Sequence, residues 1–455
     1  MNELEKLFAT KKTENGDIAY KTTGDNLTDL FFMTPYFEKN LDQVHIGESE
    51  KEKIFSMFIR DPRFGLGRRD LGRKLMQLSN VSATNIILAG RYDDLWHIPT
   101  KENIEYLKGQ VKNNELAKKW MPRLTGKDKK IAKALCKMWG ITEQEYRALI
   151  KTDSTTEYKL SYAEREEGTP LNDLFNKGNY THPLVDDINF EQVPSLAMTK
   201  YLHTFSTRED LKDRFSEYIN AVKENKAKVN TKTTNVYDAY KTANAYSVQT
   251  QEEDAREVVA NKIVDNAVVG VEMDAICILD TSGSMGWLGS GDLIDKATSV
   301  AYALATKSTY APNQVISFSS NPHLMTIKGN TLKEKYQSMY TGDCSNTDFG
   351  KVMNLLSKLE RYPEYLIVMS DMEFDYGSNQ SKKETMRIFK EHGANTKIIW
   401  WNFNDRNKTT PEFDEYGNIY LSGYNMQILK LLENKFDMTT YIDKILEDYR
   451  KKVGI

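Results

Sequence analysis

The chain has 455 residues, more than a single hydrophobic core usually serves, so two or three domains are expected. With 40% hydrophobic and 28% charged residues the composition is that of a soluble globular protein, and the formal net charge of −3 excludes a protein that is strongly basic throughout. Cys136, Cys277 and Cys344 have neither the number nor the spacing of a disulfide framework or a thiolate metal site, and free thiols indicate a reducing compartment.

The sequence contains no segment that is expected to enter a membrane. Its first residues lack the apolar core of a signal peptide. The longest apolar runs, at 275–279, 366–369 and 398–401, have the length of strands and are far shorter than a membrane span. We therefore expect a cytoplasmic protein that does not contact membranes.

Residues 1–265 are predicted to form an all-α domain. Up to about residue 28 the chain is polar and has no helical period; beyond it, apolar residues recur three and four positions apart. Glycine and proline separate these segments, so short helices with brief linkers are expected, stacked as in a solenoid although no repeat of fixed length is visible. The first helical segments are predicted around Ile54–Ile59, Leu71–Leu78, Ile104–Val111 and Ile131–Met138.

A second helical stretch is predicted from Val193 to Glu224. The segment between Lys151 and Asn189 is polar and rich in turn residues, and no structure is assigned to it. Residues 225–235 are basic and nearly devoid of large apolar side chains, which indicates an exposed loop. A further helix, containing Ala255, Val258, Val259 and Ile263, leads towards Asn266.

Residues 270–455 are predicted to form a doubly wound α/β domain, because strand-like and helical runs alternate from Val271 onward. The strands at 275–279, 366–369 and 398–401 are apolar almost without alternation, as in a mostly parallel sheet that helices cover on both faces. Further strands are predicted at 314–319 and 323–328. The predicted helices are Leu293–Ala305, Leu332–Met339, Phe349–Leu359, Lys383–Glu391, Asn425–Leu432 and Thr440–Lys452.

Polar residues follow two of the buried strands. Asp280 ends the first strand and opens the motif D-T-S-G-S, which adds the hydroxyls of Ser282 and Ser284. Asp371 follows the second strand, and Thr347 lies in the loop between them. Ligand sites of open parallel sheets lie at the carboxyl ends of strands, so these five side chains are predicted to share one site. Hard oxygen donors suit Mg²⁺, or Mn²⁺ or Ca²⁺, and two carboxylates leave a coordination position for an acidic group of a protein partner.

Two other interpretations of this motif are open. The first is that D-T-S-G-S forms only a turn and that Asp371 caps a helix. The second is a hydrolase, because S-G-S-M-G is close to the nucleophile motif G-x-S-x-G with Ser284 at its centre. Ser282 stands where that motif has glycine, and His323 and His392 lie in no recognisable context. No phosphate-binding loop, zinc-protease motif or dinucleotide fingerprint is present, and we expect no enzymatic activity.

The five residues resemble the metal-ion-dependent adhesion site of von Willebrand factor A domains. The family's D-x-S-x-S matches Asp280, Ser282 and Ser284, its loop threonine matches Thr347, and its later aspartate matches Asp371. The resemblance implies that the threonine and one or both serines contact the metal directly, whereas an aspartate can act through water.

The helical part resembles the TROVE module of the Ro autoantigen family, in I-R-D-P-R-F-G-L-G-R-R-D-L at 59–71 and A-G-R-Y-D-D-L-W-H at 89–97. In that family a ring of HEAT-like helical repeats is closed by a von Willebrand A domain. A second resemblance is to an uncharacterised family of the same layout in bacteria, phages and eukaryotes. It is carried by the opening T-E-N-G-D-I-A-Y-K-T-T-G-D-N-L-T-D-L-F-F and the later V-P-S-L-A-M. This resemblance implies, as an alternative to a cellular cytoplasmic protein, a phage protein in the bacterial host or in the virion. The resemblance to the Ro family implies binding of small structured RNAs on a basic outer surface and of RNA ends in the central hole.

Basic residues of the helical part are the candidates for such RNA contacts, because phosphate neutralisation dominates nucleic-acid affinity. Between Lys108 and Lys137 there are ten basic residues and only two acidic ones. The alternative is a solvated charged face, with Arg91 paired to Asp93 or Asp94, and Arg60 and Arg63 paired to Asp61. Trp96, Trp120 and Trp139 are expected in the core or stacked on bases. The candidates are Arg60, Arg63, Arg68, Arg69, Arg73, Lys118, Lys119, Arg123, Lys129 and Lys130.

Two functions follow from these patterns. The first is a non-catalytic, Ro-like RNA-binding scaffold that carries a divalent-metal site. The alternative is a metal-dependent protein-interaction module without RNA, in which a partner's acidic side chain completes the coordination of Mg²⁺.

Overall fold

The computed structural model describes most of the chain, and its residues form two compact units. One, here the sheet unit, comprises Met1–Met33 and Met198–Tyr441; the other, here the helical unit, comprises Thr34–Ala197 and Ile442–Ile455. In these compact units the helices after Met198 group with the sheet, whereas the domain boundary at 265–270 stays a prediction. The described residues are 11–12, 18–19, 25–151, 188–231, 234–247, 249–319, 321–340, 349–356, 361–371, 387, 389–391, 395–404, 412–413, 418–424 and 438–455.

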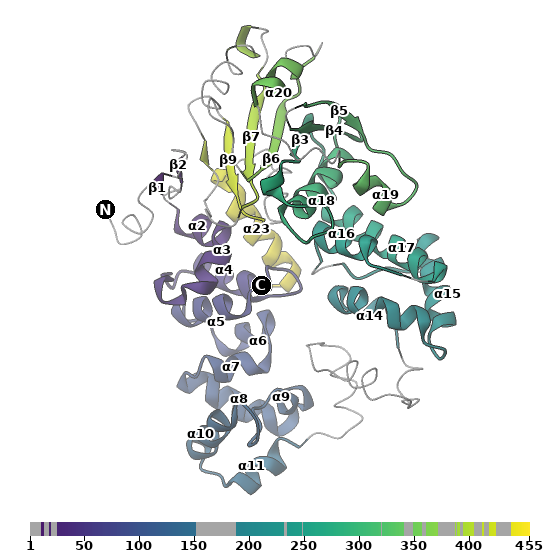
Figure 1. Ribbon diagram of the computed structural model, residues 1–455. Coiled ribbons are helices and arrows are strands. Elements are labelled where there is room, and N and C mark those ends of the chain that lie inside the picture. Colours follow the sequence, from purple (N-terminus) through teal and green to yellow (C-terminus); the bar gives the residue numbers. More distant parts are fainter. Residues whose placement is uncertain are drawn as a thin grey trace. The chain divides into compact units, whose positions relative to one another are not determined.

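The helical unit is a succession of short helices joined by brief linkers, as the sequence predicted, and α4 to α11 follow one another in chain order (Figure 1). Sequence signals set their ends: Ser49 and Glu52 form a capping box at the start of α4, and Gly140 ends α10 at φ +67°. Closure of the helices into a ring stays a prediction. The helices are α3 (Thr34–Lys39), α4 (Glu50–Arg60), α5 (Arg69–Leu78), α6 (Ala83–Ala89), α7 (Tyr92–His97), α8 (Lys101–Asn113), α9 (Glu115–Lys119), α10 (Lys129–Trp139) and α11 (Glu143–Leu149), with 3₁₀ turns at Leu41–Gln43 and Phe190–Gln192.

The helical unit also contains most of the last helix of the chain, α23 (Met438–Val453). The ring of Tyr449 packs edge-on against Phe58 of α4 with 5.6 Å between the centroids. Its hydroxyl donates a hydrogen bond to the buried carboxylate of Asp61 at 3.3 Å. The core beside α4 is therefore completed by residues from the far end of the chain.

The sheet unit is built around a seven-stranded sheet in the order β5-β4-β3-β6-β7-β9-β8. Its five central strands are parallel, and the edge strands β5 and β8 are antiparallel to their neighbours. β3 and β6 carry apolar, fully buried residues, which agrees with the predicted mostly parallel α/β sheet. The strands are β3 (Ala275–Asp280), β4 (Gln314–Phe318), β5 (Leu324–Thr326), β6 (Tyr365–Ser370), β7 (Lys397–Asn402), β8 (Glu412–Phe413) and β9 (Ile419–Ser422).

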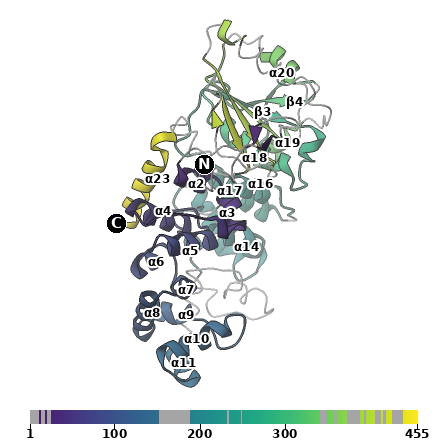
Figure 2. The same ribbon diagram turned by 90° about the vertical axis from the view of Figure 1, so that its left-hand side faces the viewer.

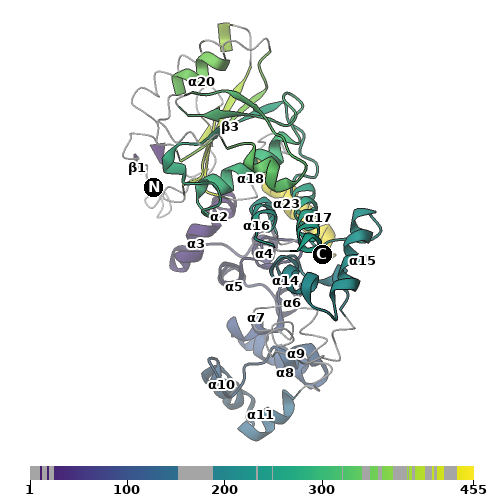
Figure 3. The same cartoon turned by 45° about the vertical axis from the view of Figure 1, so that its right-hand side comes forward.

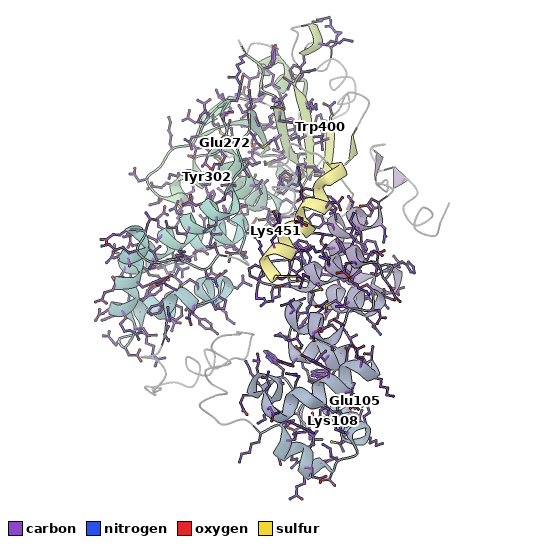
Figure 4. The ribbon with its side chains drawn as sticks, turned by 180° about the vertical axis from the view of Figure 1, so that it is seen from behind. Glu105, Lys108, Glu272, Tyr302, Trp400 and Lys451 are labelled. Atoms are coloured by element: carbon purple, nitrogen blue, oxygen red, sulfur yellow. The ribbon has the colours of Figure 1, made fainter. Side chains whose placement is uncertain are left out.

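Both faces of this sheet are covered by helices. On one face, side chains of β3, β4, β6 and β7 form a core with Val352 and Leu356 of α20 (Phe349–Leu356); Trp400 of β7 belongs to it (Figure 4). The opposite face packs against α18 (Leu293–Ala305), which carries Tyr302, and α18 in turn contacts α16 and α17 (Figures 2 and 3). The other elements of the unit are β1 (Lys11–Lys12), β2 (Ile18–Ala19), α2 (Asn26–Phe32), α14 (Ser195–Thr207), α15 (Lys212–Lys223), α16 (Val236–Asn244), α17 (Thr250–Ala267) and α19 (Leu332–Gln337).

The structure corrects the predicted elements at a few places. The stretch predicted as helical from Val193 to Glu224 is divided into α14 and α15, and α16 was not predicted at all. The short strands β1 and β2 lie in the segment predicted to be irregular, whereas the predicted helix Asn425–Leu432 and most of Lys383–Glu391 lie outside the described residues. None of the helices described here is both long and apolar enough to span a membrane.

Candidate functional site

The candidate site lies where the chain order of the sheet reverses. β3 has β4 on one side and β6 on the other, and all three strands are parallel. Because these strands are parallel, β3 and β6 end at the same edge of the sheet, and such a reversal of strand order is the place where open α/β sheets bind ligands. Asp280 ends β3, and Asp371 directly follows β6.

Asp280 is fully buried and held by two hydrogen bonds. Its Oδ1 accepts from the backbone N–H of Ser282 at 2.9 Å, and its Oδ2 accepts from Ser370 Oγ at 2.5 Å. Burial raises the pKa of Asp280 to about 6; the hydrogen bonds from Ser370 and Ser282 act in the opposite direction, and the charge of Asp371 adds to the increase. The fold thus fixes the orientation of this carboxylate without neutralising it.

Two serine hydroxyls lie in the turn after Asp280. Ser282 precedes a 3₁₀ turn at Gly283–Met285, and its Oγ lies 3.1 Å from Ser284 Oγ. Ser282 is buried, whereas Ser284 is exposed. The predicted D-x-S-x-S residues are therefore neighbours in space at the edge of the sheet.

Asp371 brings a second carboxylate to this edge. It is 5% exposed, and its charge contributes to the raised pKa of Asp280. This second charge disfavours the ionised form of Asp280 unless a cation is present. Thr347, the fifth predicted ligand, lies outside the described residues.

The described donor set suits a hard divalent cation. It comprises carboxylates and hydroxyls only, which are the ligands that Mg²⁺, Mn²⁺ and Ca²⁺ accept. Nowhere in the described parts of the chain do three or more His, Cys, Asp or Glu side chains form a metal-binding cluster. Metal binding at this edge would thus depend on the serine hydroxyls as well as on Asp280 and Asp371.

A hydrolase with Ser284 as its nucleophile would need a histidine next to that serine. Among the described residues, no histidine contacts Ser284. His323 Nδ1 instead lies 3.1 Å from the buried Ser317 Oγ and 3.0 Å from the carbonyl oxygen of Asn321. His392, the other candidate, lies outside the described residues. The described contacts therefore supply Ser284 with no general base.

A buried aspartate next to the site was missed by sequence reasoning. Asp295 of α18 is 2% exposed and accepts three hydrogen bonds, from Tyr240 Oη at 2.6 Å and from the backbone N–H groups of Gly289 and Gly291 at 2.7 Å each. Burial raises the pKa of the Tyr240 hydroxyl, so this group remains a donor. The available sequence signal was an acidic residue in the first turn of a mainly apolar helix, directly after a glycine-rich loop.

Two of the predicted RNA-contacting arginines are buried in ion pairs. Arg60 Nη2 lies 2.8 Å from Asp94 Oδ2, and Arg73 Nε lies 2.5 Å from Asp94 Oδ1; the two arginine side chains are 4% and 11% exposed. Burial alone would raise the pKa of Asp94, but the guanidinium groups of Arg60 and Arg73 hold it below its usual value. Arg91 pairs with Asp93, as expected if these arginines form intramolecular ion pairs and do not contact RNA. Arg60 and Arg73 are thus already neutralised within the fold, and a contact of either with RNA stays a prediction.

The other candidates on α4 and α5 are more exposed but also paired. Arg63 hydrogen-bonds to Asp61 at 3.3 Å, Arg68 to Glu38 at 3.3 Å, and Arg69 lies 3.7 Å from Asp70. Their side chains are between 42% and 51% exposed. The pairs of Arg68 and Arg69 involve partly exposed side chains on both sides and are therefore weak, whereas Arg63 pairs with the buried carboxylate of Asp61.

The basic segment near α10 divides into packed and exposed residues. Lys118 pairs with Glu115, Lys119 lies over the ring of Trp120, and Arg123 Nη1 donates to the carbonyl oxygen of Ile150. The buried face of α10 contains Ala132, Leu135, Cys136 and Trp139. Its exposed face carries four lysines, here the α10 lysine face: Lys129, Lys130, Lys133 and Lys137.

The tryptophans of the helical unit serve packing. Trp96 and Trp139 are 7% and 5% exposed, and Trp96 Nε1 donates to the carbonyl oxygen of Trp120 at 3.0 Å. The Trp120 ring has the Arg91 guanidinium at 4.0 Å and the Lys119 ammonium at 4.6 Å. The structure therefore favours core packing over base stacking for Trp96 and Trp139.

Comparison with known proteins finds relatives without an assigned function. Residues 274–452 match the model of a domain of unknown function, DUF7788, and residues 100–265 match that of another, DUF2828. An uncharacterised protein of Acanthamoeba polyphaga mimivirus is 23% identical over 509 residues, which cover 96% of this chain and 87% of the viral protein. The crystal structure of the Deinococcus radiodurans Ro protein (RSR) matches 94% of this chain and 95% of its own, with 13% identity and a TM-score of 0.43.

Proposed function

We propose that this protein is a non-catalytic binding scaffold whose sheet unit holds a divalent cation, Mg²⁺ in the first place, and binds a partner protein through it. One observation carries this proposal: at the switch point of the sheet, the buried carboxylate of Asp280 is followed by the adjacent hydroxyls of Ser282 and Ser284, and the charge of the buried Asp371 acts on it.

The roles of the residues follow from their chemistry. Asp280, Ser282, Ser284 and Asp371 would hold the ion, with Thr347 as a further candidate ligand. The ion would neutralise the two carboxylates and offer a coordination position to an oxygen donor from outside, such as an aspartate or glutamate of a partner. Ser370 does not contact the ion in this scheme but orients Asp280 through its hydrogen bond.

Metal titration tests the proposal with two aspartates at opposite ends of β3. Asp280→Asn changes the carboxyl end of β3, whereas Asp274→Asn changes the residue before its amino end, where Asp274 pairs with Arg361. Mn²⁺ binding, followed by calorimetry or electron paramagnetic resonance, should be lost in the first variant and kept in the second. Equal Mn²⁺ binding by the two variants, or no binding by the unchanged protein at millimolar Mn²⁺, would falsify the proposal.

A second function, RNA binding by the helical unit, is favoured by the α10 lysine face. Of these four lysines, Lys133 lies 3.3 Å from Glu143, and all four side chains are exposed. A row of exposed ammonium groups on one helix is suited to the phosphates of a structured RNA.

Co-purification tests this second function. The protein purified without nuclease should carry nucleic acid, and a panel of structured RNAs should shift in gels at ~50 mM salt, where phosphate contacts are strongest. Replacing Lys129, Lys130 and Lys137 by alanine should weaken the shift. The matched control replaces three exposed lysines of the sheet unit, Lys223, Lys226 and Lys228, and should leave it unchanged.

A further inference from the structure

The loop Gly286–Asp292, here the glycine loop, joins the candidate metal turn to α18 and has a specific backbone shape. Gly286, Gly289 and Gly291 have φ values of +88°, +93° and +86°, in the region that favours glycine. A Cβ at Gly286 would also lie 2.5 Å from the Cβ of Asp292. The sequence M-G-W-L-G-S-G-D therefore encodes a defined path of the chain.

Asp295 fixes this loop from within the fold. The backbone N–H groups of Gly289 and Gly291 both donate to its carboxylate, which Tyr240 Oη holds from α16. Tyr237 Oη also donates to the carbonyl oxygen of Gly291 at 3.4 Å. Buried charge-assisted hydrogen bonds of this kind are strong and restrict the loop to one arrangement.

The glycine loop holds a large apolar side chain in solvent. Trp287 is 64% exposed, and its carbonyl oxygen accepts from Ser290 N at 3.0 Å, which closes a tight turn behind it. Exposed tryptophans on preorganised loops are typical anchors of protein interfaces, because little conformational entropy is lost on binding. The fold thus maintains a rigid apolar contact point beside the proposed metal ligands.

The distance between this contact point and the cation ligands is short. Trp287 follows Ser284 by three residues, so their Cα atoms lie at most about 11 Å apart. An extended peptide covers that distance with about three residues. A carboxylate and an apolar side chain of one short segment can therefore reach both places.

We propose that the glycine loop and the cation together bind a peptide segment of a partner protein, in which an aspartate or glutamate lies within about three residues of an aromatic or large aliphatic side chain. This inference rests on the proposed function, because the carboxylate binds the ion held by Asp280. Trp287 supplies the apolar contact and with it the specificity for the neighbouring side chain. Asp295 and Tyr240 are positioning residues that hold the loop.

Peptide display tests this proposal on the full chain. A library of random twelve-residue peptides is selected on the protein in Mg²⁺ and eluted with EDTA, and the enriched peptides are synthesised. We expect them to carry an acidic residue with an apolar one nearby. Trp287→Ala should weaken binding of these peptides at least tenfold, while its Mn²⁺ affinity stays within twofold of the unchanged protein. The control is Leu324→Ala, which removes another exposed apolar side chain of the sheet unit and should change neither the peptide affinity nor the Mn²⁺ affinity.

The outcomes separate this inference from the function on which it rests. Absence of Mn²⁺ binding in the unchanged protein contradicts the metal site itself. If Mn²⁺ binds but no peptide is enriched, or the enriched peptides lack an apolar residue, or Trp287→Ala binds them equally well, the metal site stands and the peptide proposal is overturned. It is also overturned if Trp287→Ala instead abolishes self-association of the chain or binding of a single-stranded oligonucleotide.

Discussion

Ser370 Oγ donates a hydrogen bond of 2.5 Å to Asp280 Oδ2, and this bond joins the ends of the neighbouring parallel strands β6 and β3. It stabilises the ionised form of a carboxylate that is otherwise removed from water. Since the other oxygen of Asp280 accepts from the Ser282 backbone, both oxygens are oriented by the protein itself.

Ser370→Ala is expected to weaken Mn²⁺ binding about tenfold, since a hydrogen bond to a charged group contributes roughly 1.5 kcal/mol. The reason is that Asp280 loses the donor that favours its ionised form. Calorimetric titration measures the change. Ser319→Ala, also buried after a neighbouring strand, is the control; an unchanged affinity of the Ser370 variant would show that the hydrogen bond plays no part.

Asp280→Asn is expected to stabilise the metal-free protein at pH 7 by about 1 to 3 kcal/mol, because it removes a charge that the fold buries. The pKa of Asp280 is raised from 3.8 to about 6, so the folded state holds the proton more tightly than the unfolded chain between these values. Stability from this group is thus present below pH 4 and is lost as the pH rises through about 6. Urea unfolding at pH 4 and pH 7 should show the advantage of the variant at pH 7 only.

The affinity for the metal ion is expected to rise with pH, whereas the stability that Asp280 gives the metal-free fold falls. The ion must displace the proton of Asp280, whose pKa is about 6 in the metal-free fold. Below pH 6 the Mn²⁺ affinity should therefore fall by up to tenfold per pH unit, and it should level off above pH 7. Titrations in series from pH 5 to pH 8 test this; a flat profile would mean that Asp280 is not a ligand.

Arg60→Ala is expected to lower the free energy of unfolding by about 3 to 5 kcal/mol, because it leaves the buried carboxylate of Asp94 without one of its two guanidinium partners. Arg69→Ala, which removes a half-exposed side chain 3.7 Å from Asp70, should cost less than about 0.5 kcal/mol. Thermal or urea unfolding distinguishes them. Similar losses for both would contradict the buried network described above.

Removal of the α10 lysine face is expected to change the salt dependence of RNA binding as well as its strength. Each lysine that no longer neutralises a phosphate reduces the slope of log affinity against log salt by roughly 0.7 to 0.9. Lys129→Ala and Lys130→Ala together should therefore lower the slope by about 1.5 if both side chains bind phosphates. Gel shifts at salt concentrations between about 50 and 200 mM measure this slope, because phosphate contacts weaken strongly over that range. An unchanged slope would place the RNA elsewhere.

Much of the sheet unit was predictable because its strands are continuous apolar runs. The positions of Asp280 and Asp371 at strand ends followed from those runs, and the helix Leu293–Ala305 has the predicted limits. α16 was missed although Asn235 and Asp238 form a capping box at its start, because its apolar positions are few. The predicted metal site stays a prediction, since Thr347 lies outside the described residues.

Contacts between residues that are far apart in the sequence could not be predicted. Arg60 and Asp94 are 34 positions apart, and their ion pair depends on how α4 packs near α7. Likewise, the hydrogen bond from Tyr240 to Asp295 spans 55 positions and two helices. Charge patterning along the chain shows how many arginines are present but not which of them are neutralised inside the fold.

The contribution of α23 to the helical unit has a consequence for biosynthesis. Tyr449 and Asp61 are 388 positions apart, so α4 emerges from a ribosome long before the helix that covers it. Until then Phe58 and Asp61 lack their contacts with Tyr449, and the core beside α4 stays incomplete. The packing beside α4 is therefore completed only after α23 has been synthesised.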